Sequence, residues 1–131
     1  MFGLLIVAVI GALGFAAANY FLVKRKDAGT PLMKEIASAI QEGANAFLAH
    51  EYKVIGSIAA IIAVLLGTVV SWYTGVVFLL GALMSSSAGL IGMKIATISN
   101  VRVSNAARET KSLGKTLKIA FQGGSVMGLS V

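Results

Sequence analysis

The sequence predicts an all-α, polytopic transmembrane helix bundle, with three complete spans and the start of a fourth. The eleven Lys and Arg all fall in two windows, residues 24–53 and 94–118. The stretches 1–23, 54–93 and 119–131 carry no charged residue, whereas a soluble surface places charges every few positions. These uncharged runs also have the lengths of membrane crossings, since a helical span needs roughly 20 apolar residues. The chain is therefore expected in a bilayer.

Each span follows from the position of these runs. Residues 2–23 supply the first span. The run 54–93 is about twice the length that one crossing needs, and it is interrupted by turn formers and amphipathic aromatics at 71–75. We therefore expect a hairpin of two spans, 54–73 and 75–97.

The fourth expected span, 116–131, is incomplete, because the uncharged residues at the end of the sequence are too few for a crossing. On this reading the sequence is the N-terminal part of a single membrane domain, residues 1–131, in a larger protein.

The distribution of positive charge predicts the orientation in a cell membrane. The loops 24–53 and 94–118 lie on one side, and the positive-inside rule makes that side cytoplasmic. The segments expected outside the hydrocarbon on this side are 24–53 and 98–115, and the N-terminus is expected outside the cell. A cleaved signal peptide is disfavoured, because Lys24-Arg25-Lys26 follows the apolar run instead of preceding it.

The second span is expected to extend a long amphipathic helix. Thr30 suits the N-cap and Pro31 the first helical position. Apolar residues then recur at helical spacing, so we expect one helix from Pro31 to about Tyr73.

Small residues recur at every fourth position in several spans, a pattern that lets helices approach closely. A densely packed bundle is therefore expected. The stripes are Ala8, Ala12 and Ala16; Gly81, Ser85 and Gly89; Ala88, Gly92 and Ala96; and Ala120, Gly124 and Gly128.

Two strings resemble catalytic motifs only superficially. His50-Glu51 begins a metalloprotease pattern, but Val54 occupies the place of the second histidine. Gly114-Lys115-Thr116 resembles the end of a phosphate-binding loop, but Glu109 replaces its first glycine. His50 is therefore interpreted as a histidine at the membrane interface, and Gly114-Lys115-Thr116 as a chance match.

Polar residues near the spans are better functional candidates, because polar groups in the hydrocarbon often mark pathways. Lys94 and Asn19 lie at span ends, and snorkelling of the lysine to the headgroups is favoured over a role in ion binding. The run Ser85-Ser86-Ser87 could line a polar path, although hydroxyl bonds to the backbone or to neighbouring helices are the commoner use.

A basic, amide-rich stretch follows the third span. Asn100, Arg102, Asn105 and Arg108 could meet an anion, but a solvated loop on the positive side is the favoured interpretation. The formal net charge of +6 is explained by topology and anionic lipid, and no nucleic-acid partner is expected. Without cysteine, the sequence offers neither disulfides nor thiolate metal sites.

Several ordered strings resemble the amino-terminal region of membrane-bound, ion-pumping inorganic pyrophosphatases. They are Ala44-Asn45-Ala46-Phe47-Leu48, the string from Ser87 to Thr97, Asn100-Val101-Arg102, Ala106-Ala107-Arg108, and the string from Ala120 to Gly128. Singly they are modest, but they occur in the right order over nearly the whole chain.

The resemblance implies a homodimer of about sixteen helices per subunit in two concentric rings. Such a protein couples hydrolysis of pyrophosphate to outward movement of protons or sodium ions, with Mg²⁺ and in some members K⁺. The hydrolytic residues of the family lie on inner-ring helices beyond this sequence, whose helices resemble the outer ring. No catalytic, cofactor-binding or metal-binding residue is therefore assigned here, and the segment alone is expected to be inactive.

The residues themselves agree with a structural role. A Mg²⁺-pyrophosphate site needs clustered carboxylates, and the five acids of this sequence are dispersed. A small, non-catalytic multi-span subunit or scaffold remains the alternative, and a secondary transporter is disfavoured because no inverted repeat is visible. The acids are Asp27, Glu35, Glu42, Glu51 and Glu109.

Overall fold

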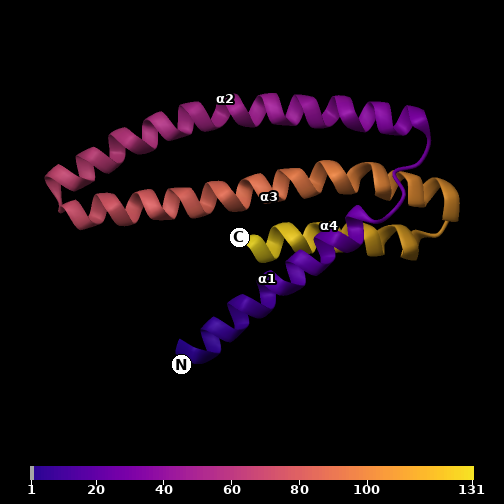
Figure 1. Cartoon of the computed structure of the whole chain (residues 1–131), viewed down its shortest axis with the longest axis horizontal. Coiled ribbons are helices and arrows are strands. Elements are labelled where there is room, and N and C mark those ends of the chain that lie inside the picture. Colours follow the sequence, from indigo (N-terminus) through magenta and orange to yellow (C-terminus); the bar gives the residue numbers. More distant parts are fainter. Residues whose placement is uncertain (1) are drawn as a thin grey trace.

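The computed structural model describes residues 2–131, which form four helices in an open bundle (Figure 1). The helices are α1 (Phe2–Lys24), α2 (Pro31–Val69), α3 (Trp72–Thr110) and α4 (Leu113–Ser130). Strands are not found among the described residues. Three helices, α1, α2 and α3, are long and apolar enough to cross a membrane, which confirms the predicted multi-span, all-helical class.

Helix α2 begins as the sequence predicts. Thr30 is the N-cap, and its hydroxyl accepts a hydrogen bond from the Met33 amide at 3.3 Å. Pro31 at the first position loses nothing, because its missing amide hydrogen would have no partner there.

The turn between α2 and α3 comes earlier than predicted. Helix α2 ends at Val69, and α3 already includes Trp72 and Tyr73, so the expectation of one helix to about Tyr73 was wrong by a few residues. The reason is capping: the Ser71 hydroxyl accepts from the Thr74 amide at 3.4 Å and starts the new helix. Two residues therefore suffice to reverse the chain.

Gly75 brings the two helices of this hairpin into backbone contact. A Cβ at this position would lie 2.6 Å from the Ala63 carbonyl oxygen and 3.3 Å from the Gly67 Cα. Further along, the Tyr52 hydroxyl donates to the Ser86 carbonyl oxygen at 2.9 Å and sits beside Gly89. The α2–α3 hairpin is thus closed at its turn and again near its middle.

Helix α3 is the centre of the bundle. It contacts α2, α4 and α1, whereas α1 contacts α4 and α3 but not α2 within the described residues. The best-buried apolar side chains, Val23, Ile95 and Val126, are 0%, 1% and 2% exposed and meet where α1, α3 and α4 converge. Elsewhere the helices expose many large apolar side chains, as a surface facing lipid or further helices requires.

The small-residue stripes are only partly used. Ala88 and Gly92 of one α3 stripe are buried, and Gly92 faces the Met127 side chain of α4. Helix α4, however, presents Gly123 to Ser99, while Gly124 and Gly128 face open space. For α4 the predicted stripe was therefore displaced by one residue from the face that packs against α3.

Candidate functional site

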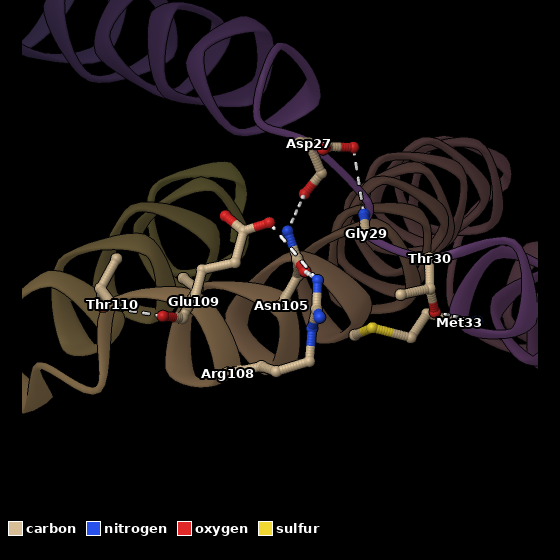
Figure 2. A network of polar contacts seen from close by, with 9 residues as sticks. Asp27, Gly29, Thr30, Met33, Asn105, Arg108, Glu109 and Thr110 are labelled. Carbon is tan, nitrogen blue, oxygen red and sulfur yellow. Dashed lines mark hydrogen bonds and ion pairs between the residues drawn. The ribbon is translucent and has the colours of Figure 1, made fainter.

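Polar side chains gather where the α1–α2 loop crosses α3, and we call this group the loop clamp: Asp27, Arg102, Asn105, Arg108 and Glu109. Figure 2 shows all of them except Arg102. Helix α3 provides every member except Asp27, because it continues to Thr110 well beyond the predicted span. One side of α3 therefore faces the loop along two helical turns.

Arg102 binds the end of α1. Its Nε donates to the Lys26 carbonyl oxygen at 3.0 Å, and one terminal nitrogen donates to the Lys24 carbonyl oxygen at 3.2 Å. The other terminal nitrogen donates to the Ile98 carbonyl oxygen of its own helix at 2.8 Å. The last carbonyls of a helix lack intrahelical partners and carry partial negative charge, so a guanidinium is a suitable cap.

Burial lowers the pKa of Arg102 from its ordinary value, and the nearby Asp27 carboxylate opposes this by raising it. An arginine nevertheless stays protonated at any physiological pH. Arg102 therefore keeps its positive charge in the clamp.

Asn105 holds the loop itself. It is 2% exposed, and its amide nitrogen lies 3.5 Å from the Asp27 carbonyl oxygen. Gly29 passes directly over it with a φ of +87°, and a Cβ there would lie 2.6 Å from the Asn105 Oδ1. Asp27 fixes this turn by accepting the Gly29 amide hydrogen at 3.1 Å. Only glycine satisfies both the dihedral and the close approach.

Arg108 completes the group from the outer side. It donates to the Asn105 Oδ1 at 3.0 Å and pairs with the Glu109 carboxylate at 3.4 Å (Figure 2). Both side chains of the ion pair are about half exposed, at 53% and 51%, so the pair itself contributes little. The main effect of Arg108 is to orient the Asn105 amide by donating to its oxygen.

The stretch from Asn100 to Arg108 was therefore interpreted wrongly as a solvated loop. It is helical, and Arg102 and Asn105 bind the backbone of another segment, while Asn100 stays exposed and outside the clamp. Sequence reasoning missed this because the partners are carbonyls of a loop more than 70 residues earlier. The available signal was that Arg102, Asn105 and Arg108 recur every three residues, which places them on one side of a helix.

Asn19 was also underestimated. It is 5% exposed, and its amide donates to the Ser125 hydroxyl of α4 at 2.9 Å. Ser125 in turn donates to the Gln122 carbonyl oxygen at 2.8 Å. A buried helix face was visible in the spacing of Ala16, Asn19 and Val23, all of which are buried.

Other polar candidates have ordinary roles. The Ser87 hydroxyl donates to the Leu83 carbonyl oxygen at 2.8 Å, as expected for a hydroxyl in a span, and Lys94 is exposed at its predicted position. His50 is exposed on α2. Gly114 and Lys115 lie in the first turn of α4, where the Thr116 hydroxyl bonds the Ser112 carbonyl oxygen.

Metal ligands do not come together in the part of the chain that the structure describes: no three His, Asp or Glu side chains form a group there. The loop clamp joins α3 to the end of α1 and to the following loop through hydrogen bonds to backbone carbonyls. Its chemistry is the capping of backbone carbonyls.

Comparison with known proteins shows which proteins have a similar sequence. The chain is 62% identical over 120 residues to a K⁺-stimulated pyrophosphate-energized sodium pump of Thermotoga maritima, covering 92% of this chain and 16% of that protein. It is 43% identical over 129 residues to K⁺-insensitive pyrophosphate-energized proton pump 2 of Moorella thermoacetica, covering 96% and 19%. A K⁺-insensitive proton pump of Methanosarcina mazei is 42% identical over 122 residues, covering 92% and 18%.

The chain thus spans less than a fifth of the length of each of these relatives. The family described as inorganic H⁺ pyrophosphatase matches residues 10–131, which include all of α2, α3 and α4 and most of α1. The chain belongs to the membrane-bound inorganic H⁺ pyrophosphatase family.

Proposed function

We propose that this chain is part of a pyrophosphate-energised ion pump, which hydrolyses inorganic pyrophosphate to phosphate and moves sodium ions or protons out of the cytoplasm. The observation that carries the proposal is the family match over residues 10–131, supported by relatives whose names describe such pumps. Relatives of both kinds cover at least 92% of the chain.

The role proposed for residues 2–131 is structural. The hydrolytic centre would need several carboxylates to hold Mg²⁺ against pyrophosphate, and acidic side chains do not gather in this segment. Instead the loop clamp and the α2–α3 hairpin give a rigid frame. We propose that these helices support the catalytic helices of the parent from the outside.

Sodium is the favoured cargo, with stimulation by K⁺. The identity of 62% to the K⁺-stimulated sodium pump exceeds the 43% and 42% to the K⁺-insensitive proton pumps. Mg²⁺ dependence and a homodimeric parent are further parts of the proposal. The positive loops 24–53 and 94–118 are placed in the cytoplasm, because the positive-inside rule favours that side.

Transport by the full-length protein tests the proposal. Inverted membrane vesicles containing it should release phosphate from pyrophosphate only with Mg²⁺, and should accumulate ²²Na⁺ faster when K⁺ is added. A protonophore should leave sodium uptake intact, whereas it would abolish the pH gradient of a proton pump. Vesicles that hydrolyse no pyrophosphate would refute the pump and favour the non-catalytic membrane subunit.

A further inference from the structure

Helices α1 and α2 diverge from their connecting loop (Figure 1). Residues of both helices and of α3 line a pocket between them. Both α1 and α2 contact α3, but they make no contact with each other in the described residues. The opening, which we call the wedge pocket, has a volume of about 480 Å³. Its lining includes Tyr20, Lys24, Lys34, Ser38, Lys94 and Arg102, so all three helices contribute.

The wedge pocket is strongly cationic. Lys24, Lys34, Lys94 and Arg102 line it, and none of its lining residues is acidic. The ion pair between Arg108 and Glu109 is the only one within the described residues, so these lysines form no direct ion pair with a carboxylate there. Arg102 donates two N–H groups to carbonyl oxygens at the end of α1 and a third to Ile98 of its own helix, but its charge remains. An anion is the ligand that such a lining attracts.

A neighbouring pocket shows that this charge pattern is specific. It has about 570 Å³ and shares Arg102 with the wedge pocket. Its other basic lining residues are Lys26, Lys115 and Lys118, but Asp27 and Glu109 line it too. Its lysines therefore face carboxylates of the same pocket, and its attraction for an anion is weaker. No carboxylate lines the wedge pocket, where Asp27 acts only on Arg102, from the side of the neighbouring pocket.

The wedge pocket lies at the level where the predicted spans end, which indicates a lipid headgroup as the source of the anion. Tyr20 and Lys24 are in the last turns of α1, and Lys94 is at the end of the predicted span 75–97. Tyrosine and lysine at such positions lie at the headgroup level. Two turns before Tyr20 and one turn before Lys94, the exposed residues are Leu13 and Leu90, which suit acyl chains.

We propose that the wedge pocket binds the phosphate headgroup of an anionic phospholipid, with the acyl chains along α1 and α3. The inference rests on the membrane topology proposed above, in which this face meets the negatively charged cytoplasmic leaflet. A lipid held there fills the space between two helices that do not touch.

Lipid retention by the detergent-purified full-length protein tests this directly. Native mass spectrometry would follow titration with dioleoyl-phosphatidylglycerol, with dioleoyl-phosphatidylcholine, and with phosphatidylglycerol in the presence of inorganic phosphate. Each basic residue near an anionic lipid surface contributes roughly fivefold in affinity, so Lys34→Gln with Lys94→Gln should weaken phosphatidylglycerol binding about 30-fold.

The matched control is Lys115→Gln with Lys118→Gln, which removes the same charge from the neighbouring pocket and should leave retention unchanged. Lys34→Arg with Lys94→Arg should also retain the lipid, because the charge is kept. Equal losses in the Gln pair and its control, or loss in the Arg pair, would overturn the proposal. Displacement by inorganic phosphate at similar concentrations would instead identify a soluble-anion site and reject the lipid.

These outcomes are independent of the pump itself, because retention is measured without pyrophosphate. Lipid retention without hydrolysis would reject only the pump, and hydrolysis without selective retention would reject only the lipid site.

Discussion

Arg102 is the side chain that joins the end of α1 to α3, through carbonyl oxygens of Lys24 and Lys26. Arg102→Lys keeps the charge but loses the planar fork that reaches both carbonyls. We expect it to destabilise the protein by about 1–3 kcal/mol, since hydrogen bonds from a charged donor would be lost. Thermal denaturation of the detergent-solubilised full-length protein measures this. Arg25→Lys, at an exposed position beside the clamp, is the control, and an equal shift in both variants would contradict the capping role.

Gly29 is the residue on which the loop conformation depends. Gly29→Ala would place a methyl group against Asn105 at a positive φ, so we expect a loss of about 1–3 kcal/mol. Gly43→Ala, on the open surface of α2, should instead stabilise by roughly 0.5–1 kcal/mol, because alanine favours the helix. Pulse proteolysis of the two variants would separate them, and a neutral Gly29→Ala would show that the loop adapts.

At the scale of elements, the α2–α3 hairpin depends on Gly75. Gly75→Ala directs a methyl group at the Ala63 carbonyl oxygen and should force the helices apart, at a cost of about 1–3 kcal/mol. Unfolding in dodecyl sulfate, followed by circular dichroism, provides the measurement. Gly81→Ala is the control on the same helix, because a Cβ there meets open space. The idea fails if both variants unfold at the same detergent fraction.

The elements were largely predictable because their signals are local. The uncharged runs located α1, α2 and α3, and Thr30 with Pro31 located the start of α2. The turn after Val69 was misplaced, because a capping serine outweighed the preference of Trp72 and Tyr73 for an interface. Local patterns show which residues can cap a helix and which segments can cross a membrane. They do not show which of two adjacent signals ends a helix.

Contacts between elements were predictable only in part. Small residues indicated close packing, yet the face of α4 that packs was one residue away from the predicted stripe, since the crossing of two helices selects the face. The hydrogen bond between Asn19 and Ser125 joins residues 106 positions apart. Arg102 is 76 and 78 positions from Lys26 and Lys24, whose carbonyls it binds. Nothing in a single sequence pairs such distant polar groups, so the loop clamp emerged only from the fold.

For the whole molecule, the proposed orientation is the most direct prediction. Single-cysteine variants of the full-length protein at Trp72→Cys and Ser38→Cys carry exposed side chains at opposite ends of α2 and α3. In intact cells, a membrane-impermeant maleimide should label position 72 and not position 38, because the positive loops are retained inside. Labelling of position 38 after permeabilisation is the control. The reverse pattern in intact cells would invert the topology.

The contact pattern of α1 has a consequence for biosynthesis. Of these four helices α1 is made first, yet its main partner is α4, the last of the four to emerge. Among the described residues, α1 does not contact the α2 that follows it. The α2–α3 pair can close as soon as it leaves the translocon, whereas α1 can bind its main partner only after α4 (Leu113–Ser130) has been made. A chain that ends before α4 but whose α3 has left the ribosome should therefore cross-link between α2 and α3, while α1 is held only by its few contacts with α3.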